Sequence, residues 1–158
     1  MGMSRRVAWV LLGFIALSTP LALAVETGLR KIMFPPEFEE VRDFLRPTLT
    51  GPVWFLLPIV ALCTLAAARW MGRRIEKRMA ARPAEEQTEA FRTKEAFDAM
   101  MLFTSLPQVP AIFGTFMFMF GAALTPVVVV MAAATLGVLV VGLVGMRQSA
   151  VGPQSRDA

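Results

Sequence analysis

A chain of 158 residues is long enough for one domain, but 56% of its residues are hydrophobic and its mean hydropathy is +0.58, which is more apolar than a soluble domain of this length. This composition excludes a compact soluble core and predicts that much of the surface faces lipid. The net charge of +4 does not indicate a nucleic-acid partner, because the basic residues flank apolar segments and not aromatic or glycine-rich recognition motifs.

Four apolar segments are long enough to cross a membrane: 7–25, 53–71, 102–124 and 127–146. A spanning helix needs about 20 mostly apolar residues, because it rises about 1.5 Å per residue through about 30 Å of hydrocarbon. Since lipid offers no partner for backbone polar groups, each segment should be helical. The sequence therefore predicts an all-α integral membrane protein, with a four-transmembrane-helix bundle that forms one domain over residues 1–147.

The basic residues predict the orientation of this bundle. Twelve of the 16 Lys and Arg residues lie before the first segment, from Arg69 near the end of the second segment to Lys94, or after the fourth segment. By the positive-inside rule, we expect both termini and the central loop in the cytoplasm, with the protein in the cell (inner) membrane. The residues expected to set this topology or to contact lipid head groups are Arg5, Arg6, Arg69, Arg73 and Arg74.

The first segment has a second interpretation. Arg5 and Arg6, an apolar run and then Ala22-Leu23-Ala24 have the order of a cleavable signal peptide, whose removal would take away residues 1–24 and leave three spans. The apolar run from Val7 is about 19 residues, longer than the roughly 7 to 15 of a usual signal-peptide core. Its length favours a retained span, and the sequence leaves both interpretations open.

A short amphipathic helix is predicted at 36–46, between the first two segments. Glutamates come early in it, and Arg42 and Arg46 come late, before Pro47, which is the order that the helix dipole favours. Its apolar residues share one face: Phe38, Val41, Phe44 and Leu45. We expect this helix to lie on the outer membrane surface with that face in the lipid interface.

The same helix carries the carboxylates Glu39, Glu40 and Asp43. Calcium loops place oxygen ligands at alternate positions around a glycine-containing turn, and a helix face does not do so. We therefore expect these carboxylates to form a solvated surface and not a cation site.

A charged cytoplasmic helical hairpin is predicted at 72–100. The helix of the second span should continue to about Ala81, and Pro83 should end it and start the next helix. The first arm is mostly basic and the second mostly acidic, so the arms should attract each other, at about 0–1 kcal/mol per exposed ion pair. Anionic lipid head groups compete for the same bases at about 1 kcal/mol each, and solvated, unpaired arms are the third possibility. The residues predicted to pair are Lys77, Arg78, Arg82, Glu85, Glu86 and Glu89.

The third segment contains Pro107, Gln108 and Pro110, and the two prolines should kink or break its helix. The Gln108 side chain and the hydroxyl groups of Thr104 and Ser105 are placed to bond the freed carbonyls or a neighbouring helix. A broken helix with a polar side chain is also how transporter sites are built. The break is therefore interpreted first as structural and, alternatively, as a solute site.

Small residues on the third and fourth segments predict close helix packing. Thr125 is expected as the N-cap of the fourth helix, with Pro126 at its first position. The small residues of the fourth helix expected to face the third span are Ala133, Gly137, Gly142 and Gly145. The tail 148–158 is expected to be disordered. The residues predicted to pack helices on the third segment are Ala111, Gly114 and Gly121.

The residue types that the sequence lacks limit its chemistry. Without histidine it offers no His-ligated zinc or haem and no Ser-His or Cys-His pair, and Cys63 is its single cysteine. The four segments contain no ionisable side chain except Arg69, whereas coupled transport needs one at membrane depth. We therefore expect no catalytic residue, no cofactor and no metal site.

Two functions remain from the sequence. The favoured one is a non-enzymatic accessory or scaffold subunit, which docks onto a membrane-protein partner or onto itself through small-residue faces and the charged hairpin, with membrane lipids as further partners. The alternative is an uncoupled small-solute channel or transporter that uses the break at Pro107, Gln108 and Pro110.

Overall fold

The computed structural model describes residues 5–83 and 88–150, which form helices joined by turns. Their bounds are α1 Arg5–Met33, α2 Glu37–Trp54, α3 Leu56–Ala80, α4 Glu89–Phe103, α5 Gln108–Met119 and α6 Leu124–Ala150. Four helical stretches are long and apolar enough to cross a membrane: Trp9–Arg30, Glu37–Ala80, Phe91–Met119 and Leu124–Gln148. The predicted all-α class is thus confirmed for the described residues, which include four helical stretches with the length and composition to cross a membrane.

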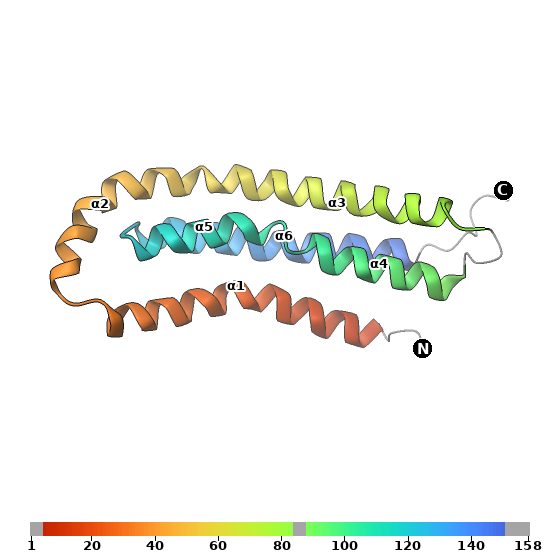
Figure 1. The fold of residues 1–158 in the computed structure, drawn as a ribbon, viewed down its shortest axis with the longest axis horizontal. Helices are drawn as coiled ribbons and strands as arrows, with labels where there is room; N and C mark the ends of the chain where they lie inside the picture. The colour runs from red at the N-terminus through yellow and green to blue at the C-terminus, as the bar shows by residue number, and fades with distance from the viewer. Residues whose placement is uncertain (1–4, 84–87, 151–158) are drawn as a thin grey trace.

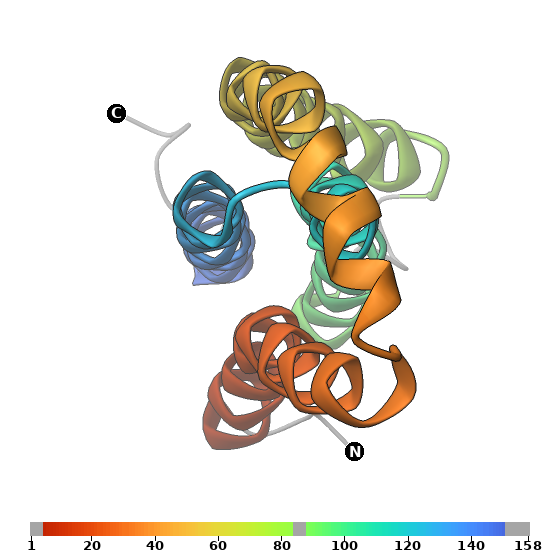
Figure 2. The same ribbon diagram turned by 90° about the vertical axis from the view of Figure 1, so that its left-hand side faces the viewer.

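The helices run lengthwise side by side, except where α2 crosses one end of the bundle (Figure 1). Seen from that end, α2 passes over the end of α5 on its way from α1 to α3 (Figure 2). Helix α6 is central, because it contacts each of the other five described helices. We call the end covered by α2 the α2 end. The opposite end, where α3 leads toward α4, where α1 begins and where α6 finishes, is the hairpin end (Figure 1).

Three apolar clusters hold the bundle together. The first lies toward the α2 end and joins α2, α3, α5 and α6. The second lies toward the hairpin end and joins α3, α4 and α6, and the third joins α1 to α6. Many large apolar side chains outside the clusters stay exposed, among them Phe14, Leu17 and Leu136. Such a surface suits contact with lipid more than with water.

Helix α1 is longer than the predicted first span, because it continues without interruption from Arg5 to Met33. The stretch able to cross a membrane therefore includes Glu26 and Arg30, which corrects the expectation of a first span without ionisable groups. Pro20 lies inside this helix and cannot donate to the carbonyl of Ala16. The hydroxyl of Thr135 in α6 lies 3.5 Å from that carbonyl and so replaces the missing donor.

The predicted end of the amphipathic helix at residue 46 is wrong, because α2 runs through Pro47 and Pro52 to Trp54. Each proline removes one helical hydrogen bond and curves the helix. The first part of α2 crosses the bundle end, and its last part turns toward α3 (Figure 1). Packing of Val53 and Leu49 in the first cluster offsets the lost bonds, so the helix continues.

The predicted start of the second hairpin arm at Pro83 is also wrong. Thr88 has an extended backbone, with φ −74° and ψ 155°, and its side chain accepts a hydrogen bond from the Phe91 N–H at 3.3 Å. It is therefore the N-cap of α4, which begins at Glu89. At the other turn, α6 begins at Leu124, so Thr125 lies inside the first turn and is not the N-cap.

Helix α5 ends at Met119, earlier than the predicted boundary at residue 124. Gly121 has a φ of +125°, and its N–H donates to the Phe118 carbonyl at 3.1 Å. The N–H of Ala122 donates to the Met117 carbonyl at 2.8 Å. These two bonds form a Schellman motif, which ends the helix and needs a glycine at this position.

Candidate functional site

The helix break expected around Pro107 and Pro110 lies between α4 and α5, where residues 104–107 form turns. Nε2 of Gln108 donates a hydrogen bond to the backbone carbonyl of Ile15 in α1, at 2.9 Å. The Gln108 side chain therefore ties the break to a neighbouring helix.

The hydroxyl groups beside the break bond to the last turn of α4. Thr104 Oγ1 donates to the Met100 carbonyl at 2.9 Å, and Ser105 Oγ donates to the Leu102 carbonyl at 2.6 Å. A hollow of about 390 Å³ lies between this region and α1, and none of the residues that line it is ionisable. The polar groups at the break thus already have partners within the chain.

The predicted packing residues lie against helices of the same chain. A Cβ on Gly137 would meet Thr64 Oγ1 and would lie 2.9 Å from Cβ of Pro107, so α6 approaches α3 and the break closely there. A Cβ on Gly114 would lie 3.6 Å from Leu56, an ordinary contact. Ala111 is fully buried and Ala133 is partly buried in the first cluster.

The two later glycines of α6 face different helices. A Cβ on Gly142 would overlap the Leu12 side chain of α1. A Cβ on Gly145 would lie 3.3 Å from Cβ of Met100 in α4 and 3.3 Å from the sulfur of Met71 in α3. The expectation that both face the third span is therefore wrong for Gly142, because α1 packs beside α6 at that level.

The hairpin end carries a basic surface on one side of α3. An open hollow of about 580 Å³ is lined by residues that we call the basic strip: Trp70, Arg73, Arg74, Lys77 and Arg78. None of the four basic residues of the strip forms an ion pair with another described residue. Arg69, just before it, is also exposed. Their charges are therefore turned to the surroundings.

The two hairpin arms are held together chiefly by apolar contacts. Ile75 of α3 and Ala96 and Ala99 of α4 are buried in the second cluster. The Arg82 guanidinium lies 5.1 Å from the centre of the Phe91 ring, a cation–π contact.

Some predicted site residues fall where the structure gives no side-chain description. Glu85 and Glu86 lie outside the described residues, as does the tail from residue 151. For Arg5, Arg6 and Glu89, the backbone alone is described. The ion pairing predicted for Lys77, Arg78, Arg82, Glu85, Glu86 and Glu89 therefore stays a prediction.

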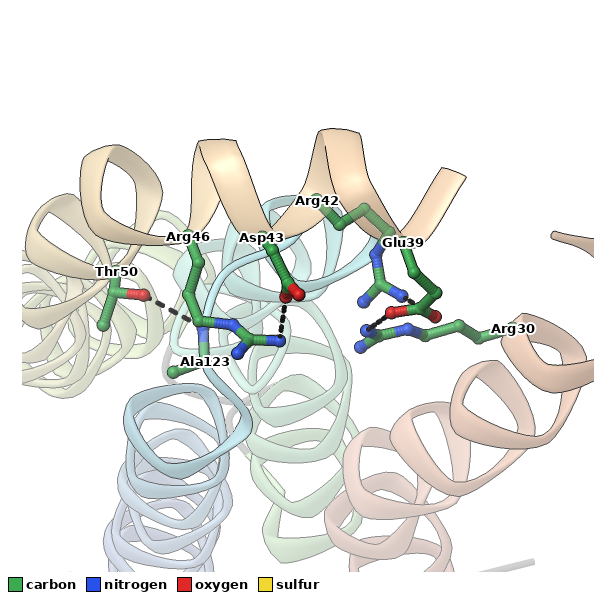
Figure 3. A network of polar contacts seen from close by, with 7 residues as sticks. All are labelled: Arg30, Glu39, Arg42, Asp43, Arg46, Thr50 and Ala123. Carbon is green, nitrogen blue, oxygen red and sulfur yellow. Dashed lines mark hydrogen bonds and ion pairs between the residues drawn. The ribbon is translucent and has the colours of Figure 1, made fainter. Parts of the chain in front are cut away.

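The α2 end brings together charged residues that are not close in the sequence (Figure 3). Glu39 of α2 lies between two arginines: its Oε1 is 2.8 Å from Nη1 of Arg42, and its Oε2 is 3.9 Å from Nη2 of Arg30 in α1. Asp43 and Arg46 form a third pair at 2.8 Å. The pair between Arg30 and Glu39 connects α1 to α2, and the other two pairs lie within α2.

Arg42 is fully buried, with an exposed fraction of 0%. Its Nε and Nη2 have no hydrogen-bond partner among the described residues. The remaining guanidinium nitrogen, Nη1, donates a hydrogen bond to Oε1 of Glu39. Buried charges are normally paired and hydrogen-bonded, because desolvation of an unmatched donor is costly. The Arg42 side chain therefore points into the bundle, whereas Val41 and Phe44 are exposed.

The turn between α5 and α6 docks directly under α2. Gly121 approaches the backbone of Arg42 so closely that a Cβ would lie 2.6 Å from the Arg42 carbonyl oxygen. The N–H of Ala123 donates to Oγ1 of Thr50 at 3.0 Å (Figure 3). Gly121 was predicted to pack spans three and four, and its place is in this turn, against α2.

A cavity of about 480 Å³ lies beneath α2, with Arg30, Glu39 and Arg46 in its wall. The Arg30 guanidinium lies 4.7 Å from the centre of the Phe118 ring, which is also part of the wall. From the sequence, Arg30 entered only the topology count and Arg46 was also interpreted as a base at the end of a short helix, so this site was not predicted. The available signal was Glu39 and Asp43, each three residues before an arginine.

No family model, curated protein or solved structure compared with this chain matches it. The fold and the helix composition define it as an all-helical chain with four stretches able to cross a membrane.

Proposed function

We propose that this chain is a non-enzymatic accessory or scaffold subunit of a cell membrane. It spans the membrane four times with the hairpin end in the cytoplasm, and its basic strip docks onto an acidic surface of a larger membrane complex. The observation that carries this proposal is the basic strip itself, with four positive charges that lack ion-pair partners among the described residues.

The small-residue faces of the helices are already occupied by contacts within this chain. Gly114, Gly137, Gly142 and Gly145 are used for contacts between helices of this chain, so they leave little small-residue surface for a partner. Opposite charges across an interface guide encounter and specify orientation. Trp70, the aromatic residue of the strip, is 53% exposed and supplies the kind of aromatic anchor that is enriched at interfaces.

The orientation is tested by thiol labelling in whole cells. In a Cys63→Ser background, Ala80→Cys marks the hairpin end and Thr48→Cys marks the α2 end; both positions are exposed. A membrane-impermeant maleimide is expected to label Thr48→Cys in intact cells and to label Ala80→Cys after lysis only. Labelling of Ala80→Cys in intact cells would reverse the proposed orientation.

Docking is tested by pull-down of the full-length chain from membranes in mild detergent. The double substitution Arg73→Glu and Lys77→Glu is expected to release a stoichiometric partner that the unmodified chain retains. The matched control is Lys94→Glu with Arg147→Glu, which changes the same charge at exposed positions on α4 and α6. Equal loss of partner in both variants, or no stoichiometric partner for the unmodified chain, contradicts the proposal.

The second candidate is an uncoupled channel or transporter, favoured by the hollow beside the break. Under this alternative, Gln108→Leu abolishes solute flux into liposomes that contain the purified protein. Under the accessory-subunit proposal, the same substitution leaves partner retention unchanged, because Gln108 bonds to Ile15 inside the bundle.

A further inference from the structure

The cavity beneath α2 is built from three parts of the chain that meet at the bundle end. Arg30 comes from α1, Arg46 from α2, and Phe118 with Leu124 from the region of the α5–α6 turn. Its volume of about 480 Å³ falls in the range of small-ligand sites, roughly 300–1,000 Å³. The site is far from the basic strip, at the opposite end of α3 (Figure 1).

The charges around this cavity do not balance. Two arginines, Arg30 and Arg46, line the cavity together with one carboxylate, Glu39, which leaves one positive charge in excess among the described lining residues (Figure 3). The excess selects an anion and disfavours a cation.

The arginine donors are only partly used. The Glu39 carboxylate is committed to Arg42 at 2.8 Å and approaches Arg30 at 3.9 Å, which is too long for a hydrogen bond. Arg42 does not line the cavity, but two of its buried nitrogens lack partners among the described residues, so Glu39 cannot leave it without cost. A guanidinium presents forked N–H donors that match the paired oxygens of carboxylate or phosphate.

Most of the remaining lining residues are apolar: Phe118, Ala122, Ala123 and Leu124. Phe118 holds the Arg30 guanidinium over its ring, and Leu124, 45% exposed, forms part of the rim at the end of the apolar spans. A charged group bound in the cavity would therefore lie next to the apolar surface of the helices. This arrangement suits a lipid whose head group occupies the cavity and whose acyl chains lie along the bundle.

The geometry points to a binding site for an anionic phosphate or carboxylate group in the cavity beneath α2, held by Arg30 and Arg46 and neutralising the excess charge of the arginine cluster. The same chemistry is offered by an anionic lipid head group and by a small soluble anion. Binding at this site is independent of docking through the basic strip, so the two proposals fail separately.

The test uses the full-length protein in neutral detergent with two probes. In the first arm, native mass spectrometry compares retention of phosphatidylglycerol with that of phosphatidylcholine. In the second arm, thermal unfolding is followed while inorganic phosphate replaces chloride at constant ionic strength. Arg30→Gln and Arg46→Gln remove one cavity arginine each, and Lys77→Gln on the basic strip is the matched control.

The unmodified protein is expected to bind at least one of the two probes, and each cavity variant is expected to bind it about tenfold more weakly, the effect of losing one charge-assisted hydrogen-bonding group. Lys77→Gln should bind as the unmodified protein does. Retention of phosphatidylglycerol alone identifies a lipid head group, and a response to inorganic phosphate identifies a soluble anion.

Three results overturn the inference: neither probe binds, the cavity variants bind as well as the unmodified protein, or Lys77→Gln loses as much binding as they do. Circular dichroism and gel filtration check that the variants are folded. Because Arg46 is half-exposed at 51%, Arg46→Gln decides the question even if Arg30→Gln fails to fold.

Discussion

The two ends of the bundle use their charges in opposite ways. At the α2 end, arginines and carboxylates from α1 and α2 pair with each other, and one guanidinium is fully buried. At the hairpin end, the basic strip forms no ion pair with the described residues, and apolar contacts hold α3 against α4. Ion pairs at the α2 end therefore contribute to the fold, whereas the ion pairs expected at the hairpin end stay a prediction.

This contrast predicts that the α2 end is sensitive to small changes and the hairpin end is tolerant. Burial explains the difference, because an ion pair in water contributes little, while an unmatched charge or a clash inside the protein is costly.

The largest effect is expected for Gly121→Ala. Its φ of +125° strains any side chain, and the added Cβ would lie 2.6 Å from the Arg42 carbonyl oxygen. We expect a loss of about 3 kcal/mol in unfolding free energy, measured by unfolding in detergent. In the control Gly51→Ala, the Cβ meets nothing within 4 Å, and the helix gains up to about 1 kcal/mol. If the two variants had similar unfolding free energies, the close contact between α2 and the α5–α6 turn would not contribute to stability.

A smaller loss is expected for Glu39→Gln, which leaves the buried Arg42 without its anion. We expect about 2 kcal/mol, below the range for a wholly buried pair because Glu39 is itself 55% exposed. The matched control is Asp43→Asn, which breaks an exposed pair and should cost under about 1 kcal/mol. If both substitutions cost the same, burial of Arg42 does not govern the stability of this end.

Gln108→Leu tests the middle of the bundle. It removes the hydrogen bond to Ile15 and should cost about 1 kcal/mol, with faster amide exchange in the nearby turn of α1. Ser105→Ala serves as the control, since that hydroxyl is exposed and bonds within its own segment, so its loss should be within about 0.5 kcal/mol. An unchanged exchange pattern in α1 after Gln108→Leu would argue against this link.

The most local effect is expected at the hairpin end. Thr88→Ala removes the N-cap of α4 and should cost about 1 kcal/mol. Hydrogen exchange is expected to rise in the first turn of α4 and to stay unchanged in α2. Spread of the effect to α2 would show that the two ends are coupled, contrary to the contrast drawn above.

Much of the architecture was predictable from local sequence. The four apolar segments, the break at Pro107 and Pro110 and the end of α3 near Ala81 each depend on residues close together in the chain. Boundaries failed where a contact distant in sequence decided them. Helix α2 passes Pro47 because Val53 packs in the first cluster, which periodicity alone does not reveal.

The charged cavity could not be predicted for the same reason. Thr50 and Ala123 are 73 residues apart, and their hydrogen bond depends on α2 lying across the bundle end. Glu39 and Asp43 were expected on a solvated face, and they are indeed more than half exposed. The burial of Arg42 beside them follows from the crossing of α2, which brings that side of the helix over the α5–α6 turn.

The helical class and the four stretches with the length and composition to cross a membrane could be predicted from the sequence, because backbone hydrogen bonding and the length of an apolar run are local properties. The burial of an ion-paired arginine, the helix contacted by each packing glycine and the position of the cavity could be read only from the tertiary structure. Those outcomes depend on the side chains that distant segments bring together. Whether a guanidinium is buried depends on the helices that pack around it.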